Sequence, residues 1–112
     1  MADSAVQFED WELERMKGVA VLSTIGADGF PHSAPVGMRV EGGALWFETQ
    51  DGSVKLRNIN RNPRVAVLFH GQPKWGVLVH GVAAVVSPGD GNRQPQIRIT
   101  PKRKASWKRK EG

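Results

Sequence analysis

The most constraining feature of this chain is a series of six short apolar runs separated by turn-forming residues. The runs lie at residues 18–25, 30–40, 44–50, 64–70, 75–87 and 96–100. Their length and their content of valine, isoleucine and aromatic residues are typical of β-strands, and glycine, proline and asparagine punctuate the segments between them. Pro31 and Pro35 indicate sheet edges or bulges, and Gly81 indicates a kink in the longest run. We therefore predict a mainly β fold, a six-stranded antiparallel barrel with one or two short helices, rather than a sandwich or an α/β fold.

The length of 112 residues supports a single domain. We expect an N-terminal helix within residues 1–17, where Ser4 and Gln7 fit a capping box at the start of an amphipathic stretch. Residues 18–107 form the barrel domain in this interpretation, and residues 108–112 form a basic tail.

The net charge of +5 and the pI near 10.1 raise the question of nucleic-acid binding. Six of the basic residues are concentrated near the C-terminus: Lys102, Arg103, Lys104, Lys108, Arg109 and Lys110. Residues 1–101 hold ten basic and ten acidic residues, so the net charge of this part is zero. A nucleic-acid-binding module that acts through the tail and Trp107 is therefore a minor alternative only.

The chain contains no cysteine, which excludes disulfides and thiolate metal sites. No stretch reaches the roughly 18 apolar residues that a membrane-spanning helix needs. The acidic, polar N-terminus argues against a signal peptide. We expect a cytoplasmic protein without a membrane segment.

No constellation typical of acid–base or nucleophilic catalysis is present. His32, His70 and His80 lack a metal-ligand spacing and an acidic partner. The serines lack the surroundings of a nucleophile, and suitably paired carboxylates are absent. We therefore predict neither catalytic residues nor a metal site.

The segment of residues 49–64 carries the clearest binding signal. Ser53 is a plausible N-cap of a helix of about two turns that Pro63 ends, and Lys55 and Arg57 lie in its first turn. A helix N-terminus with a serine hydroxyl and a lysine is a good phosphate site. The spacing alone does not favour this phosphate site over the alternative, a helix whose basic side chains are simply exposed to solvent.

The order of motifs resembles the pyridoxamine-phosphate-oxidase-like, FMN-binding split-barrel superfamily. The shared order is A-D-G-x-P-H, a P-V strand, L-W-F, and S-x-K-x-R-N-x-x-x-N-P-R-V. The ending IRITPKRKASW is similar to the R-I-x-P-x-R-x-x-S-W close of members that use the deazaflavin coenzyme F(420). The resemblance covers residues 18–107 and implies a six-stranded antiparallel split β-barrel that works as a homodimer, with the cofactor at the interface.

The resemblance also implies which residues hold the cofactor, either coenzyme F(420) or FMN, with the basic ending favouring F(420). Ring contacts fall on His32, Ser33, Ala34, Pro35 and Val36. Contacts to the ribityl chain and the phosphate fall on Thr49, Ser53, Lys55 and Arg57, and Trp107 reaches the partner's site. Arg61 and Arg64 match positions with a structural role.

The implied function is an oxidoreductase that transfers a hydride between the reduced cofactor and a small conjugated acceptor. The cofactor carries this chemistry itself, which agrees with the absence of an acid–base pair. The alternative is a non-catalytic carrier or sensor that binds a flavin, a deazaflavin or haem. One departure from the family pattern concerns the substrate wall, because only nine residues, SPGDGNRQP, stand where many relatives have a helical segment.

Overall fold

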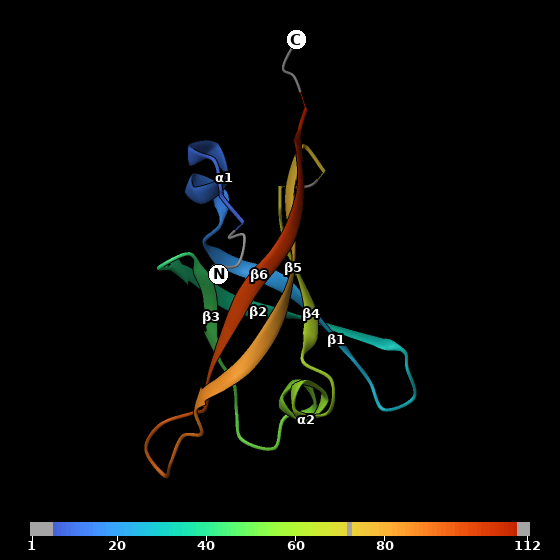
Figure 1. The fold of residues 1–112 in the computed structure, drawn as a ribbon, viewed down its shortest axis with the longest axis vertical. Helices are drawn as coiled ribbons and strands as arrows, with labels where there is room; N and C mark the ends of the chain where they lie inside the picture. The colour runs from blue at the N-terminus through green and yellow to red at the C-terminus, as the bar shows by residue number, and fades with distance from the viewer. Residues whose placement is uncertain (1–5, 72, 110–112) are drawn as a thin grey trace, which may run out of the picture.

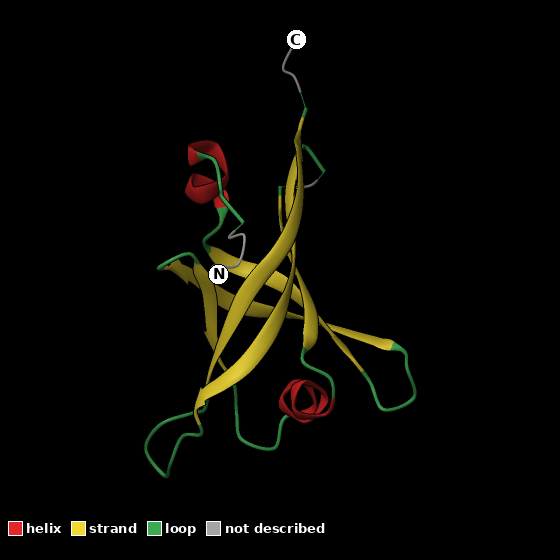
Figure 2. Ribbon diagram, in the orientation of Figure 1, coloured by secondary structure: helices red, strands yellow, loops and turns green. Residues whose placement is uncertain are grey.

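The computed structural model describes residues 6–71 and 73–109, which form a barrel with a short helix at each end (Figures 1 and 2). The elements are α1 (Asp10–Arg15), β1 (Gly18–Ile25), β2 (Pro31–Glu41), β3 (Ala44–Glu48), α2 (Val54–Arg61), β4 (Arg64–His70), β5 (Trp75–Ser87) and β6 (Gln96–Lys108). The mainly β prediction with six antiparallel strands and two short helices is confirmed.

The strands close into a barrel in the order β1-β2-β3-β6-β5-β4, and every pairing is antiparallel. Along each strand, alternate side chains point into the barrel because successive residues of a strand face opposite sides. In β1, for example, Ala20, Leu22 and Thr24 are buried whereas Val19 is exposed. The interior is closely filled by apolar side chains, of which Phe47, Phe69, Leu45, Ile97 and Ile99 are among the largest.

The last strand is longer than predicted. The sequence interpretation ended it at Thr100 because Pro101 follows, but β6 continues to Lys108. The proline is accommodated at a register shift: His80 pairs with Arg103 whereas Gly81 pairs with Pro101, so one extra residue of β6 bulges out. Four of the six basic residues near the C-terminus, Lys102, Arg103, Lys104 and Lys108, therefore belong to the barrel wall, and Lys110 lies outside the described residues.

The N-terminal helix is shorter than predicted. It begins after Glu9 and ends at Arg15 rather than near Gly18, and the predicted cap Ser4 lies outside the described residues. The backbone N–H of Glu9 donates to the Glu12 carboxylate at 2.7 Å, which gives the capping interaction at this end.

Glu12 connects α1 to the C-terminal half of β6. Its side chain is fully buried and accepts hydrogen bonds from Lys104 Nζ at 2.6 Å and Ser106 Oγ at 2.5 Å. Burial raises the pKa of the Glu12 carboxyl, but the bonds from Lys104, Ser106 and the Glu9 backbone outweigh it and hold the pKa below its ordinary value. A charged clamp thus fixes α1 against β6.

The second helix forms as predicted. Ser53 Oγ accepts a hydrogen bond from the Leu56 N–H at 3.2 Å and caps the helix, which ends before Pro63. The buried Asn58 side chain donates to Thr24 Oγ1 of β1 at 3.0 Å and thereby anchors α2 to the barrel. Across the described residues, neither helix has the length and apolarity needed to cross a membrane.

Candidate functional site

The β2 strand has an open edge. Residues 31–38 pair with β1 on one side, whereas the pairing with β3 begins only at Arg39. The backbone polar groups of this stretch on the side away from β1 are therefore free of a ladder partner among the described strands. Such an edge offers N–H and C=O groups to a ligand in a fixed row. This is the strand to which the resemblance assigns the ring contacts.

The predicted ring-contact residues divide between the two faces of β2. Val36 is buried in the barrel core, so only its backbone is available to a ligand. His32 and Ala34 are half-buried on the same side but beyond the closed part of the barrel. Ser33 and Pro35 are exposed on the outer face, where Ser33 Oγ lies 2.8 Å from Ser23 Oγ of β1.

The start of α2 brings together Thr49 and Ser53. Thr49 is buried, and its hydroxyl donates to Ser53 Oγ at 3.0 Å. Because Ser53 Oγ also accepts the Leu56 N–H, both of its lone pairs are used and its own hydroxyl proton remains to be donated. Lys55 is half-buried in the first turn of α2 and forms no ion pair within the described chain. The sequence prediction of an anion-binding helix start fits this geometry.

Arg57 is engaged with the loop directly before the helix start. Its Nη1 donates to the Gly52 carbonyl at 2.8 Å and braces the loop that precedes the helix. It lines a depression of about 460 Å³ between α2 and the β1–β2 hairpin, together with His32 and Arg61. Arg61 donates to Asn58 Oδ1 at 3.3 Å, in keeping with a structural role.

Trp107 lies at the opposite end of the barrel from α2. Its ring packs across Gly76 of β5, at a place where any Cβ would collide with it, and it is 46% exposed. Within one protomer it is therefore separate from the other predicted site residues. The prediction that it reaches a partner's site stays a prediction.

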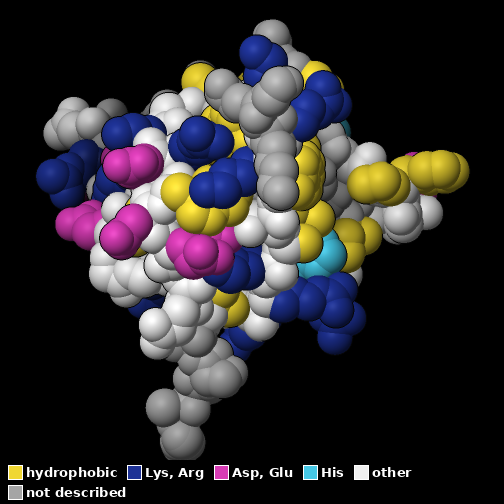
Figure 3. Space-filling view, turned by 90° about the horizontal axis from the view of Figure 1, so that it is seen from above, with side chains coloured by type: hydrophobic (Ala, Val, Ile, Leu, Met, Phe, Trp, Pro, Cys, Tyr) yellow, Lys and Arg dark blue, Asp and Glu magenta, His cyan; other side chains and the backbone are white. Residues whose placement is uncertain are grey.

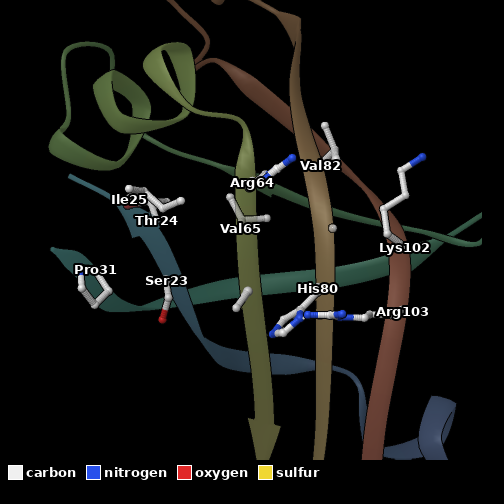
Figure 4. Close-up of a pocket in the computed structure, with 12 residues that line it drawn as sticks. Ser23, Thr24, Ile25, Pro31, Arg64, Val65, His80, Val82, Lys102 and Arg103 are labelled. Carbon is white, nitrogen blue, oxygen red and sulfur yellow. Dashed lines mark hydrogen bonds between the residues drawn. The ribbon is translucent and has the colours of Figure 1, made fainter. Parts of the chain in front are cut away.

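A second hollow lies on the outer face of the barrel, which sequence reasoning did not find. It has a volume of about 560 Å³ and is lined in part by Arg64, His80, Lys102 and Arg103 (Figure 4). These residues come from three strands and meet only through the strand register. The available signal was their position on the outward-facing side of each strand, which needs the pairing to be interpreted.

The fold and the site together define a class of protein, the split β-barrels with an open second strand and a serine-capped helix after the third. A family model described as pyridoxamine 5'-phosphate oxidase matches residues 11–108. The chain therefore belongs to the pyridoxamine 5'-phosphate oxidase family.

Individual relatives agree with this assignment. A 5a,11a-dehydrotetracycline/5a,11a-dehydrooxytetracycline reductase from Streptomyces rimosus is 33% identical over 108 residues, with 83% of this chain and 76% of the relative covered. A conserved hypothetical protein from Mycobacterium tuberculosis superposes with a TM-score of 0.75 at 25% identity over 96% of this chain and 89% of its own. An F(420) reductase shares the fold at a TM-score of 0.76 and 20% identity, over 88% and 98% of the two chains.

Proposed function

We propose that this protein is an oxidoreductase that binds coenzyme F(420) or FMN and transfers a hydride between the reduced cofactor and a small conjugated acceptor. The comparisons support oxidoreductase chemistry in broad terms, because a relative 33% identical to this chain is named a reductase. The observation that carries the proposal is the combination of an open β2 edge with a start of α2 that presents the Ser53 hydroxyl and Lys55. A phosphorylated flavin or deazaflavin needs both features, one for the ring and one for the phosphate.

The start of α2 fits the phosphate. The free hydroxyl proton of Ser53 and the ammonium group of Lys55 are donors at the positive end of the helix dipole. Buried Thr49 orients the Ser53 hydroxyl through its own hydrogen bond. Arg57 supports the loop around the phosphate from behind, through the Gly52 carbonyl.

The β2 edge fits the ring. Proline has no N–H to give to a ladder, so Pro31 and Pro35 suit positions whose backbone groups face away from β1. Ser33 and Gly37 share this side of the strand because backbone groups alternate along it. The N–H groups of Ser33 and Gly37 then donate to the ring heteroatoms. The carbonyl groups of Pro31 and Pro35 lie on the same side of the strand.

The cofactor supplies the hydride chemistry when it is bound. This chain holds the cofactor at both ends, orients the ring along β2 and shields one side of it with the barrel wall. A strong acid–base pair is not required for these tasks. The loop of residues 88–95 between β5 and β6 contains no helix, so the protein lacks the helical segment that many relatives have at this position.

A homodimer completes the site in this proposal. Pro35, Val21, Leu68, Leu78 and Ala105 are successive partners across five strands and form an apolar row on the outer face. All five are exposed or half-buried, and further apolar side chains are exposed at the projecting hairpin (Figure 3). In the proposed dimer a second copy covers this row, and Trp107 of one protomer closes the site of the other.

Turnover with the reduced cofactor tests the proposal. Reduced F(420) and reduced FMN are each mixed with the protein and a panel of enones, imines and quinones, and cofactor oxidation is followed by absorbance. We expect protein-dependent oxidation with at least one acceptor, since the named relative reduces a dehydro compound. Tight cofactor binding without turnover on any acceptor would identify a carrier or sensor and refute the enzyme.

A further inference from the structure

The outer hollow is a groove lined by both apolar and cationic side chains, and we call it the outer groove. Ile25, Pro31 and Val82 supply apolar surface, and its floor is the small side chain of Ala66. Arg64, Lys102 and Arg103 supply three positive charges. Figure 4 shows Arg64 and Lys102 on either side of Val82, with Arg103 reaching His80. A volume of about 560 Å³ is within the range of small-molecule sites.

The cations of the outer groove have no acidic partner in the described part of the chain. The ion pairs found there are Arg39 with Glu41 and Lys104 with Glu12, neither of which involves the groove. Three cations without an acidic partner beside apolar surface create a local positive potential, which favours an anionic ligand over a neutral one of the same shape.

A polar row crosses the floor of the groove. Ser23, Ala66, His80 and Arg103 line the groove and are successive partners across four strands, and Ser33 of β2 continues the row outside the groove lining. Arg103 Nε donates to His80 Nδ1 at 2.9 Å, so the neutral imidazole carries its proton on Nε2. On the far side of Ala66, the Ser23 and Ser33 hydroxyls bond to each other at 2.8 Å. The row therefore presents hydrogen-bond donors from both of its sides.

We propose that the outer groove binds the acceptor substrate and that this substrate is a flat apolar molecule with a delocalised oxyanion, a carboxylate or an enolate. The apolar side chains of Ile25 and Val82 receive the body of the molecule, and Arg64 and Arg103 receive the anion. Pro31 belongs both to this groove and to the β2 edge, so a substrate in the groove lies beside the strand assigned to the cofactor ring. This assignment of a substrate class rests on the proposed function.

Equilibrium binding of 2-naphthoate tests the groove, with the neutral 2-naphthamide as a matched ligand of the same shape. Both are titrated into the purified protein and followed by naphthalene fluorescence. We expect the acid to bind at least tenfold more tightly than the amide. Arg64→Gln and Arg103→Gln should each weaken the acid about tenfold, the loss of one charge-assisted hydrogen bond. Arg98→Gln removes the same charge from an exposed position of β6 outside the groove and should leave the affinity unchanged.

Equal affinity for the acid and the amide, no binding of the acid, or equal losses in all three variants would overturn the groove assignment. Circular dichroism of each variant establishes that it is folded. A parallel titration with FMN and F(420) separates the two proposals. If the protein binds a cofactor but does not prefer the acid to the amide, the groove assignment is refuted and the proposed function stands. If the protein prefers the acid but binds neither cofactor, the proposed function is refuted and the groove assignment stands.

Discussion

The buried carboxylate of Glu12 gives the sharpest stability prediction. Three donors converge on its two oxygens: Lys104 Nζ at 2.6 Å, Ser106 Oγ at 2.5 Å and the Glu9 N–H at 2.7 Å. Glu12→Gln keeps the shape of the side chain but replaces one acceptor oxygen with an NH₂ group. That group must then face at least one of the three donors, and the charge of Lys104 loses its partner.

The cost follows from these contacts. A hydrogen bond to a charged group contributes about 1.5 to 3 kcal/mol, and a buried donor left without an acceptor costs a similar amount. The Lys104 side chain is 24% exposed and recovers part of its hydration, which lowers the total. We expect Glu12→Gln to lower the free energy of unfolding by about 2 to 3 kcal/mol at neutral pH.

The stability difference between the wild type and Glu12→Gln should decrease as the pH is lowered. The folded protein holds the pKa of Glu12 below its ordinary value of 4.5, so the stabilisation is complete above about pH 4.5. It is lost as the pH falls through the lower pKa of the folded state, where the carboxylate takes up a proton. The difference between the wild type and Glu12→Gln should therefore shrink below pH 4.5.

Urea unfolding followed by tryptophan fluorescence measures this difference, because Trp11 is half-buried on the same helix. Glu14→Gln, an exposed position of α1, is the matched control and should change stability by less than about 0.5 kcal/mol. Equal effects of the two substitutions, or a difference that stays constant from pH 7 to pH 3, would refute the clamp.

Three further predictions concern the barrel, the helix anchor and the dimer. In Gly81→Ala, the added Cβ would lie 2.6 Å from Ile99 Cγ2 and 2.7 Å from the Thr100 carbonyl oxygen, so thermal unfolding should report a loss of about 1 to 3 kcal/mol. Asn58→Ala leaves Thr24 without its partner and should cost about 1 to 3 kcal/mol in urea unfolding; an unchanged stability would contradict the anchor. Leu68→Asp places a charge in the apolar row and should yield a folded monomer in sedimentation velocity, whereas an unchanged oligomeric state would contradict the proposed interface.

The sequence predicted the strands well because each run follows strand composition and ends at strong turn residues. The helix after the third strand was equally predictable, since Ser53 caps it and Pro63 ends it. The length of β6 was not predictable from the sequence. A proline such as Pro101 usually ends a strand unless it lies at a β-bulge, and this bulge depends on the pairing with Gly81 of β5.

The site was predictable where its residues are neighbours in the sequence. Thr49 and Ser53 are four residues apart and bond directly. The outer groove depends instead on pairings between β1, β4, β5 and β6, so that Ser23 and His80 share one row only through the register. The role of Glu12 was likewise hidden, since its partner Lys104 is 92 residues away in the sequence.

Cofactor affinity tests the central claim most directly. The purified protein is titrated with FMN and with F(420), and the dissociation constants are compared between the wild type, Lys55→Ala and the exposed control Arg98→Ala. Saturable binding of at least one cofactor is expected, with a loss of about 1 to 3 kcal/mol for Lys55→Ala and none for Arg98→Ala. Binding of neither cofactor, or affinities that are the same in all three proteins, would contradict the assignment of the phosphate to the start of α2.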